Sequence, residues 1–161
     1  MESEIITVEK LDEDQVIIGQ GNFSIYTCDD IFRTLLTTAP EIKIGVAMNE
    51  AVPKLVRYTD NDEDLGKKAA NTALKIGAGH LFVIFMRNAY PINVLSTLKA
   101  IPGVVNIYIA TANPIEVIIG KTKLGNSILG VVDGQTANNI ETNEQREERR
   151  SLVKKIGYIL G

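Results

Sequence analysis

Short runs of alternating or continuous apolar residues recur along the chain and predict a series of β-strands. The alternating stretch Ile5–Leu11 and the run Val16–Gly19 flank an acidic turn at residues 12–14, which predicts a β-hairpin. The run Leu81–Met86 is apolar at every position, as is typical of a central strand covered on both faces. Further strands are predicted over residues 42–48, 54–58, 104–110, 115–120 and 128–132.

Helical patterns fall between these predicted strands. Thr27 is a suitable N-cap for a helix that ends before Pro40. A longer helix is predicted from about Asp62 to Ile76, with Asp60 or Asn61 as its N-cap and Gly77 directly after its end. Two more helices are predicted over residues 91–98 and, as a charged helix with a solvated face, from about 142 to 160.

The order of these elements predicts an α/β fold in which helices pack against a mixed sheet. The strand–helix–strand stretch from Leu81 to Ala110 predicts two parallel strands joined by a right-handed crossover. A length of 161 residues suits one domain with one substantial core, so we expect a single domain over residues 1–161.

The net charge, the length of the apolar runs and the N-terminal residues indicate which binding partners and which cellular location to expect for this protein. The net charge is −3, and no stretch of the chain supplies the clustered basic face that nucleic-acid binding requires. No apolar run approaches the ~18–20 residues that cross a membrane. The first residues are acidic and lack the pattern of a signal peptide. We therefore expect a cytoplasmic protein that binds neither nucleic acid nor membrane.

The chain contains one cysteine, Cys28, and one histidine, His80. A single cysteine excludes an intramolecular disulfide, and the two residues together cannot form a His/Cys zinc site within one subunit. No metal ligand is therefore assigned. Cys28 stands near the start of a predicted helix and is interpreted as a small packing residue.

Two stretches resemble common nucleotide-binding motifs but do not complete them. Gly120-Lys121-Thr122 ends like a phosphate-binding P-loop, yet Ile115 occupies the position of its first glycine and no helix is predicted to follow. Gly19-Gln20-Gly21 begins like a dinucleotide fingerprint, yet Ser24 replaces the third glycine. The sequence therefore indicates no common nucleotide-binding cassette.

Polar residues cluster at the ends of three predicted strands. Asn49-Glu50 and Thr111–Asn113 each follow a strand, and Asn126-Ser127 precede one. In open α/β sheets ligands bind near the carboxyl ends of the strands, and amide and hydroxyl side chains suit ribose hydroxyls and base edges. Turns also favour these residue types, so ordinary turn chemistry is the alternative for each cluster.

His80 lies between a glycine-containing turn, Gly77-Ala78-Gly79, and the central apolar strand. The glycines allow a close backbone turn and the approach of an anion to the main chain. A neutral imidazole is also a competent nucleophile toward phosphorus. The alternative is a half-buried histidine that caps the preceding helix, and local chemistry alone favours neither interpretation.

Six short motifs, taken together, cover nearly the whole chain in a characteristic order. They are Ile17-Ile18-Gly19-Gln20, Ile44-Gly45-Val46-Ala47, Gly77-Ala78-Gly79-His80, Pro91-Ile92-Asn93-Val94-Leu95, Ala110-Thr111-Ala112-Asn113-Pro114 and Leu129-Gly130-Val131-Val132-Asp133-Gly134. In order and spacing they resemble the adenosine-specific kinase family of small, mostly archaeal proteins. The resemblance implies a three-layer α/β/α sandwich and a homo-oligomer built on a trimer. It also implies binding of adenosine or AMP and a stably phosphorylated histidine.

The resemblance implies that His80 accepts the phosphoryl group, and the positions of the other polar residues suggest their roles. Glu50 is a candidate base or hydrogen-bond partner. Candidate ligand contacts are Asn49, Asn93, Thr111, Asn113 and Ser127, with Arg57 or Lys54 to offset phosphate charge. The phosphoryl donor, ATP or another nucleotide, and a magnesium requirement are left open.

One segment departs from the family pattern. Members often carry Cys-Glu-Ala-Ser where this chain has Asn49-Glu50-Ala51-Val52, so no role of that thiol or hydroxyl transfers here. Three functions remain: a kinase acting through a phosphohistidine, a non-catalytic AMP or adenosine sensor, and a structural oligomer with a vestigial pocket. Binding measurements coupled to a turnover assay distinguish the first two.

Overall fold

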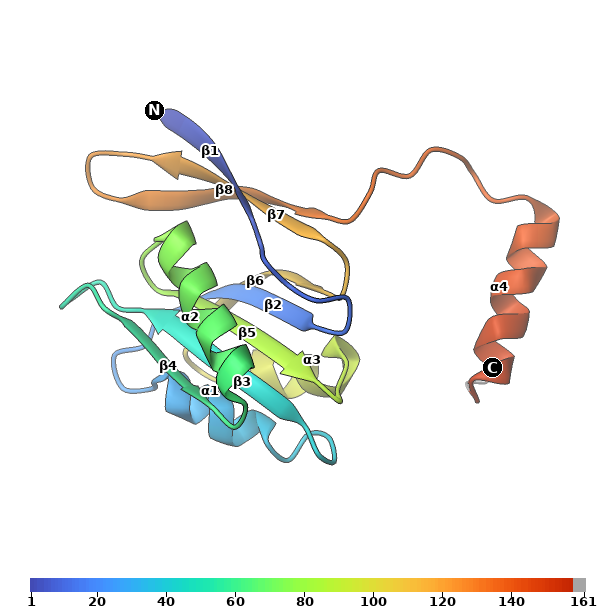
Figure 1. Ribbon diagram of the computed structural model, residues 1–161, viewed down its shortest axis with the longest axis horizontal. Helices are drawn as coiled ribbons and strands as arrows, with labels where there is room; N and C mark the ends of the chain where they lie inside the picture. Colours follow the sequence, from blue (N-terminus) through green and yellow to red (C-terminus); the bar gives the residue numbers. More distant parts are fainter. Residues whose placement is uncertain (158–161) are drawn as a thin grey trace.

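Two β-sheets and four helices make up residues 1–157, the part of the chain that the computed structural model describes (Figure 1). The five-stranded sheet has the order β4-β3-β5-β2-β6 and the smaller sheet the order β1-β7-β8. The strands are β1 (Glu2–Thr7), β2 (Gln15–Gly21), β3 (Lys43–Asn49), β4 (Val56–Asp60), β5 (Leu81–Arg87), β6 (Val104–Thr111), β7 (Ile115–Lys121) and β8 (Asn126–Asp133). The helices are α1 (Cys28–Leu35), α2 (Glu63–Ile76), α3 (Pro91–Lys99) and α4 (Asn143–Lys155).

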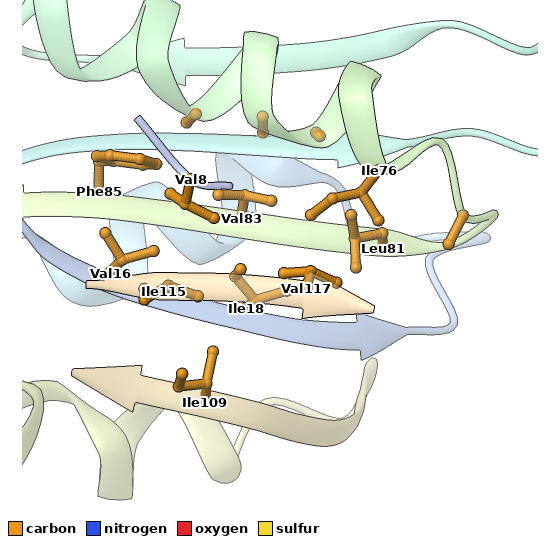
Figure 2. Packing of buried hydrophobic residues seen from close by; sticks show 14 of the residues in the cluster. Val8, Val16, Ile18, Ile76, Leu81, Val83, Phe85, Ile109, Ile115 and Val117 are labelled. Carbon is orange, nitrogen blue, oxygen red and sulfur yellow. The ribbon is translucent and has the colours of Figure 1, made fainter. Parts of the chain in front are cut away.

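Apolar side chains on both faces of the five-stranded sheet create two cores and three layers. On one face, residues such as Ile84 and Met86 pack with α1 and α3. On the other face, Val83 and Phe85 pack with α2 and with the inner side of the three-stranded sheet (Figure 2). The predicted central strand, now β5, is therefore covered on both faces, and the α/β sandwich is confirmed.

The pairing within the sheets differs from the expected mixed sheet. All pairs of neighbouring strands run antiparallel in the described structure. β5 and β6 do point the same way, as predicted, because both pair antiparallel with β2, which lies between them. A pattern along the chain shows the direction of two strands but not that a third strand is inserted between them.

The predicted hairpin at the N-terminus is wrong. β1 pairs with β7 in the small sheet, with Ile5 opposite Ile118, whereas β2 lies in the large sheet. The connection between β1 and β2 crosses from one layer to the other and ends at Asp14, whose side chain is fully buried. The two apolar runs each overlap a strand, although β1 spans Glu2–Thr7 rather than Ile5–Leu11. An acidic turn does not show that its flanking strands pair.

Helix ends follow the sequence signals closely. Thr27 caps α1 as predicted, with Asp30 completing a capping box. Gly77 ends α2 in the left-handed conformation at φ 65°, as predicted. The N-cap of α2 is Asp62 rather than a residue before it, because the side chain of Asn61 is engaged with the backbone of Ile42 and Ile44.

The helix α4 is separate from the rest of the molecule. Thr142 caps its first turn and none of its described residues is buried, which agrees with a solvated charged helix. Figure 1 shows it at the end of an extended segment, away from both sheets. The helix ends at Lys155 and residues 156–157 form a turn, short of the predicted end near residue 160; residues 158–160 lie outside the described part of the chain. Within residues 1–157 no helix has both the length and the apolar character needed to span a membrane.

Candidate functional site

An open cavity of about 760 Å³ lies where three segments meet at one end of the large sheet. The segments are the connection from β3 to β4, the C-terminal end of α2 with the following glycines, and the turn from β7 to β8. Four of the residues singled out in the sequence line it: Asn49, Glu50, Lys54 and Ser127.

Asn49 fastens two walls of this cavity together. It is 7% exposed, and its Nδ2 donates to the carbonyl oxygens of Ala73 and Ala78, both at 2.9 Å. These two bonds hold the end of β3 against the last turn of α2 and fix the orientation of the amide. The other amide atom, Oδ1, is buried without a hydrogen-bond partner among the described residues.

His80 occupies a constrained backbone position directly after Gly79 of the cavity wall, but it is not itself among the residues that line the cavity. Its N–H donates to the carbonyl of Asn49 at 3.1 Å, and its own carbonyl accepts from the N–H of Gly21 at 2.8 Å. Its φ of 57° lies in the left-handed region, where non-glycine residues are uncommon. Its side chain is partly exposed, and Gly79 directly before it lines the cavity. The backbone therefore holds this partly exposed residue firmly beside the cavity wall.

Glu50 and Arg57 bring opposite charges to the same end of the sheet. Arg57 Nε lies 3.0 Å from Glu50 Oε2, an ion pair that lacks the alignment of a hydrogen bond. The Glu50 side chain is 26% exposed and Arg57 is half-exposed, so both remain available to a ligand. Burial raises the pKa of the nearby Cys28 thiol to about 11, and the carboxylates of Asp29 and Glu50 contribute to the rise. Cys28 is buried, as expected for a packing residue.

The turn between β7 and β8 is tied internally and to α2. The hydroxyl of Thr122 accepts from the N–H groups of Leu124 and Gly125. Asn126 Nδ2 donates to the carbonyl of Ile76 at 2.9 Å, which satisfies a free carbonyl at the end of α2. The turn is thereby held over the helix end, and Ser127 is placed on the cavity wall.

The remaining candidate residues lie at the opposite end of the sheet. Thr111 pairs with Val16 of β2, and Val16 pairs on its other side with Phe85 near the end of β5. His80, in contrast, directly precedes the start of β5. Seven residues of strand span about 20 Å. Asn113 hydrogen-bonds Asp133, and Asn93 accepts from Tyr90 N–H at the first turn of α3, which follows β5. Within one chain these three residues do not share the cavity.

The antiparallel pairing explains this separation. We expected the carboxyl ends of the strands to converge, as they do in a parallel sheet. β3 runs antiparallel to β5, so its carboxyl end, with Asn49 and Glu50, lies beside the start of β5. β6 runs in the direction of β5, so Thr111 lies beside the end of β5.

Sequence reasoning missed the apolar walls of the cavity. Leu55, Leu74 and Leu124 line it and are 48%, 67% and 100% exposed. A leucine on the polar side of a helix and another at a turn tip are weak signals, because single exposed apolar residues are common. Thr122 also lines the cavity, although its stretch does not form a P-loop.

One comparison with known proteins identifies a family, and another finds a similar solved structure. The model of a family described as "Adenosine specific kinase" matches residues 6–159. The crystal structure of the PH1918 protein from Pyrococcus horikoshii OT3 is similar to this chain, with a TM-score of 0.95 and 59% sequence identity. The similarity covers 99% of each chain. A search of curated proteins finds no match.

Proposed function

This chain belongs to the adenosine specific kinase family, and on that premise we propose that its cavity binds adenosine or AMP and that His80 carries a phosphoryl group to adenosine. The observation that supports the proposal most is the position of His80. The only histidine of the chain directly follows a residue of the cavity wall and is hydrogen-bonded through its backbone to Asn49, which lines the same cavity.

The size and lining of the cavity suit a nucleoside. Small-molecule sites commonly measure about 300–1,000 Å³ and combine apolar walls with a few polar groups. Here the leucines at positions 55, 74 and 124 offer apolar surface to a purine ring. Glu50, Lys54 and Ser127 offer a carboxylate, an ammonium and a hydroxyl to the ribose and phosphate.

The proposed chemistry proceeds in two displacements at phosphorus. An imidazole nitrogen of His80 attacks the donor phosphoryl group, forming an N–P bond while the P–O bond to the leaving group breaks and its electrons remain on that oxygen. A hydroxyl of adenosine then attacks, forming an O–P bond as the N–P bond breaks, and its proton passes to a base. Such a covalent intermediate divides one transfer into two easier steps.

The other site residues support these steps in our proposal. Glu50 takes the hydroxyl proton or orients the ribose, and Arg57 beside it offsets phosphate charge together with Lys54. The donor is ATP or another nucleotide, and magnesium is to be tested with each donor. We also propose a cytoplasmic homo-oligomer built on a trimer.

A substitution at Gly79 tests the location of the ligand site. Gly79 lines the cavity and a Cβ there would meet no atom within 4 Å, so Gly79→Leu adds a bulky side chain to the cavity wall where its first carbon has open space. Asn71→Leu adds the same side chain on an exposed part of α2 that is not among the residues lining the cavity. We expect calorimetry to show AMP and adenosine binding that Gly79→Leu weakens at least tenfold and Asn71→Leu leaves unchanged. Equal affinity in all three proteins would refute this site.

Turnover separates the kinase from the sensor. Conversion of adenosine to AMP by the unmodified chain, with any nucleoside triphosphate or diphosphate as donor, supports the kinase. Tight AMP binding without product from any donor would remove the kinase proposal and leave an AMP-binding module in this same cavity.

A further inference from the structure

The four edge strands of the two sheets differ sharply in charge. β4 carries Arg57 and Asp60, and β1 carries Glu2 and Glu4. β6 contains no charged residue over its whole length, and β8 has only its last residue, Asp133. Charged or short edges are the usual protection against pairing with another chain, because an edge strand presents free backbone donors and acceptors. β6 and β8 lack that protection.

The two uncharged strands lie against each other on one side of the molecule. β6 and β8 are in contact, and Ile109 and Tyr108 of β6 belong to the same apolar cluster as Ile128 and Val131 of β8. We call the outer side of these two strands the edge face. A groove of about 490 Å³ runs along β6 next to α3, and Val105 on this strand is 62% exposed.

The chain beyond β8, residues 134–157, forms a C-terminal arm that is directed away from its own body. Gly134 has a φ of 69° and donates its N–H to the carbonyl of Pro114 at 2.9 Å. Asn113 donates to Asp133 at 3.0 Å just before it. These bonds fix the direction in which the chain leaves β8, and Figure 1 shows the arm extending outward to α4.

The arm carries apolar residues that the rest of residues 1–157 leaves exposed. Ile140, Leu152 and Ile156 are 94%, 60% and 62% exposed. Leu152 lies in the last turn of α4 and Ile156 is its C-cap, four residues later, so the two residues lie toward the same side of the helix end. A helix of 13 residues is marginally stable in water by itself and normally depends on packing.

We infer that the C-terminal arm of one copy docks on the edge face of a second copy, with Leu152 and Ile156 in the groove between β6 and α3. Each copy of the chain has one exposed apolar edge face and one exposed apolar arm. Any assembly of identical copies therefore contains as many arms as edge faces. The fixed exit at Gly134 carries the arm away from its own body, so a second copy is the occupant that the geometry favours. Such head-to-tail contacts close into a ring when the rotation between copies permits.

Mixed cross-linking of cysteine variants tests the docking directly. Cys28 is buried, so surface cysteines introduced at positions 105 and 152 are the reactive thiols. Differently tagged Val105→Cys and Leu152→Cys chains are produced in the same cells, purified together and treated with a short bismaleimide. We expect a cross-linked dimer that contains both tags. Ile25→Cys, on an exposed loop before α1, is the matched control with Leu152→Cys and is expected to give none.

Three results would overturn the inference. Cross-linking of Leu152→Cys to itself but not to Val105→Cys means that arms pair with arms. A monomer in sedimentation at tens of micromolar means that nothing docks. In the same measurement we expect the double substitution Leu152→Glu with Ile156→Glu to lower the mass of the assembly, and Ile25→Glu to leave it unchanged. An unchanged mass of the double variant would equally refute the docking.

Discussion

Asp14 is the clearest place to test how this fold is held together. Its carboxylate is fully buried at the start of β2 and accepts from Arg87 Nε at 2.6 Å, Lys68 Nζ at 2.8 Å and the N–H of Leu11 at 2.9 Å. These partners come from β5, from α2 and from the connection between the two sheets. Replacing Asp14 with Asn keeps the shape of the side chain and removes the charge that links β5, α2 and the connection between the sheets.

The burial of the Asp14 carboxylate and of its two cationic partners sets the size of the stability loss. Removing one partner of a fully buried ion pair costs about 3–5 kcal/mol. Arg87 and Lys68 are 20% exposed and both keep Asp64, at 2.8 and 3.1 Å. Solvent and Asp64 therefore reduce the loss, and we expect Asp14→Asn to lower the free energy of unfolding by about 2–3 kcal/mol.

The pH dependence has a definite sign. Burial alone would raise the pKa of Asp14, but the hydrogen bonds from Lys68 and Arg87 outweigh it and lower the pKa below its ordinary value. A lowered folded-state pKa stabilises the fold above the unfolded value of about 3.9, and this contribution is lost as the pH falls through the lower folded value. The difference between wild type and Asp14→Asn should therefore be full at pH 7 and shrink below about pH 4.

Urea unfolding at pH 7 and at pH 3 to 4 measures both expectations. Glu63→Gln is the control, because it removes one charge from an exposed pair with Lys67 and should leave the midpoint in place. The reasoning is refuted if Asp14→Asn is as stable as wild type at pH 7, or if the difference between them grows as the pH falls.

Three further predictions follow from local geometry. A Cβ on Gly45 would lie 2.4 Å from backbone atoms of Leu65 and Gly66, so Gly45→Ala should push α2 away from β3. We expect thermal unfolding to show a loss of about 1–3 kcal/mol in stability. Gly130→Ala, where a Cβ has open space, should show no such loss. Cys28 is buried and its pKa is raised to about 11, so its thiol should resist an aromatic disulfide reagent at pH 8 in the native protein. It should react only when urea unfolds the chain, and rapid labelling of the native protein would contradict this. His80 at φ 57° should accept Asn with a change in stability below about 0.5 kcal/mol, whereas Val should cost about 1–2 kcal/mol; equal stability of the two variants would show that the left-handed backbone is not maintained.

The elements of this fold follow from local signals, and their pairing does not. The cap at Thr27, the left-handed end at Gly77 and the doubly covered strand β5 depend on neighbouring residues, so the sequence predicts them. The partner of β1 depends on β7, more than a hundred residues away, and the acidic turn before β2 gives no sign of it. The burial of Asp14 likewise depends on Lys68 and Arg87, which no local pattern connects to it.

The candidate site was predictable only in part for the same reason. Asn49 and Glu50 stand out as polar residues directly after a buried strand, and the structure places them on the cavity wall. Thr111 has the same signal and lies at the other end of the sheet, because the direction of its strand relative to β3 decides where it ends. Asn126 shows what sequence reasoning cannot supply, since its contact with Ile76 exists only after the small sheet docks on α2.

The phosphorylation state of His80 tests the central proposal most directly. The chain is incubated with each candidate nucleotide donor, and its intact mass is recorded before and after adenosine is added, with His80→Asn as the control that keeps the left-handed backbone. The proposal predicts an acid-labile increase of one phosphoryl group in the wild type, none in His80→Asn, and its loss on adding adenosine with AMP formed in equal amount. A phosphoryl group that also appears on His80→Asn, or AMP formed by that variant at the wild-type rate, would contradict it.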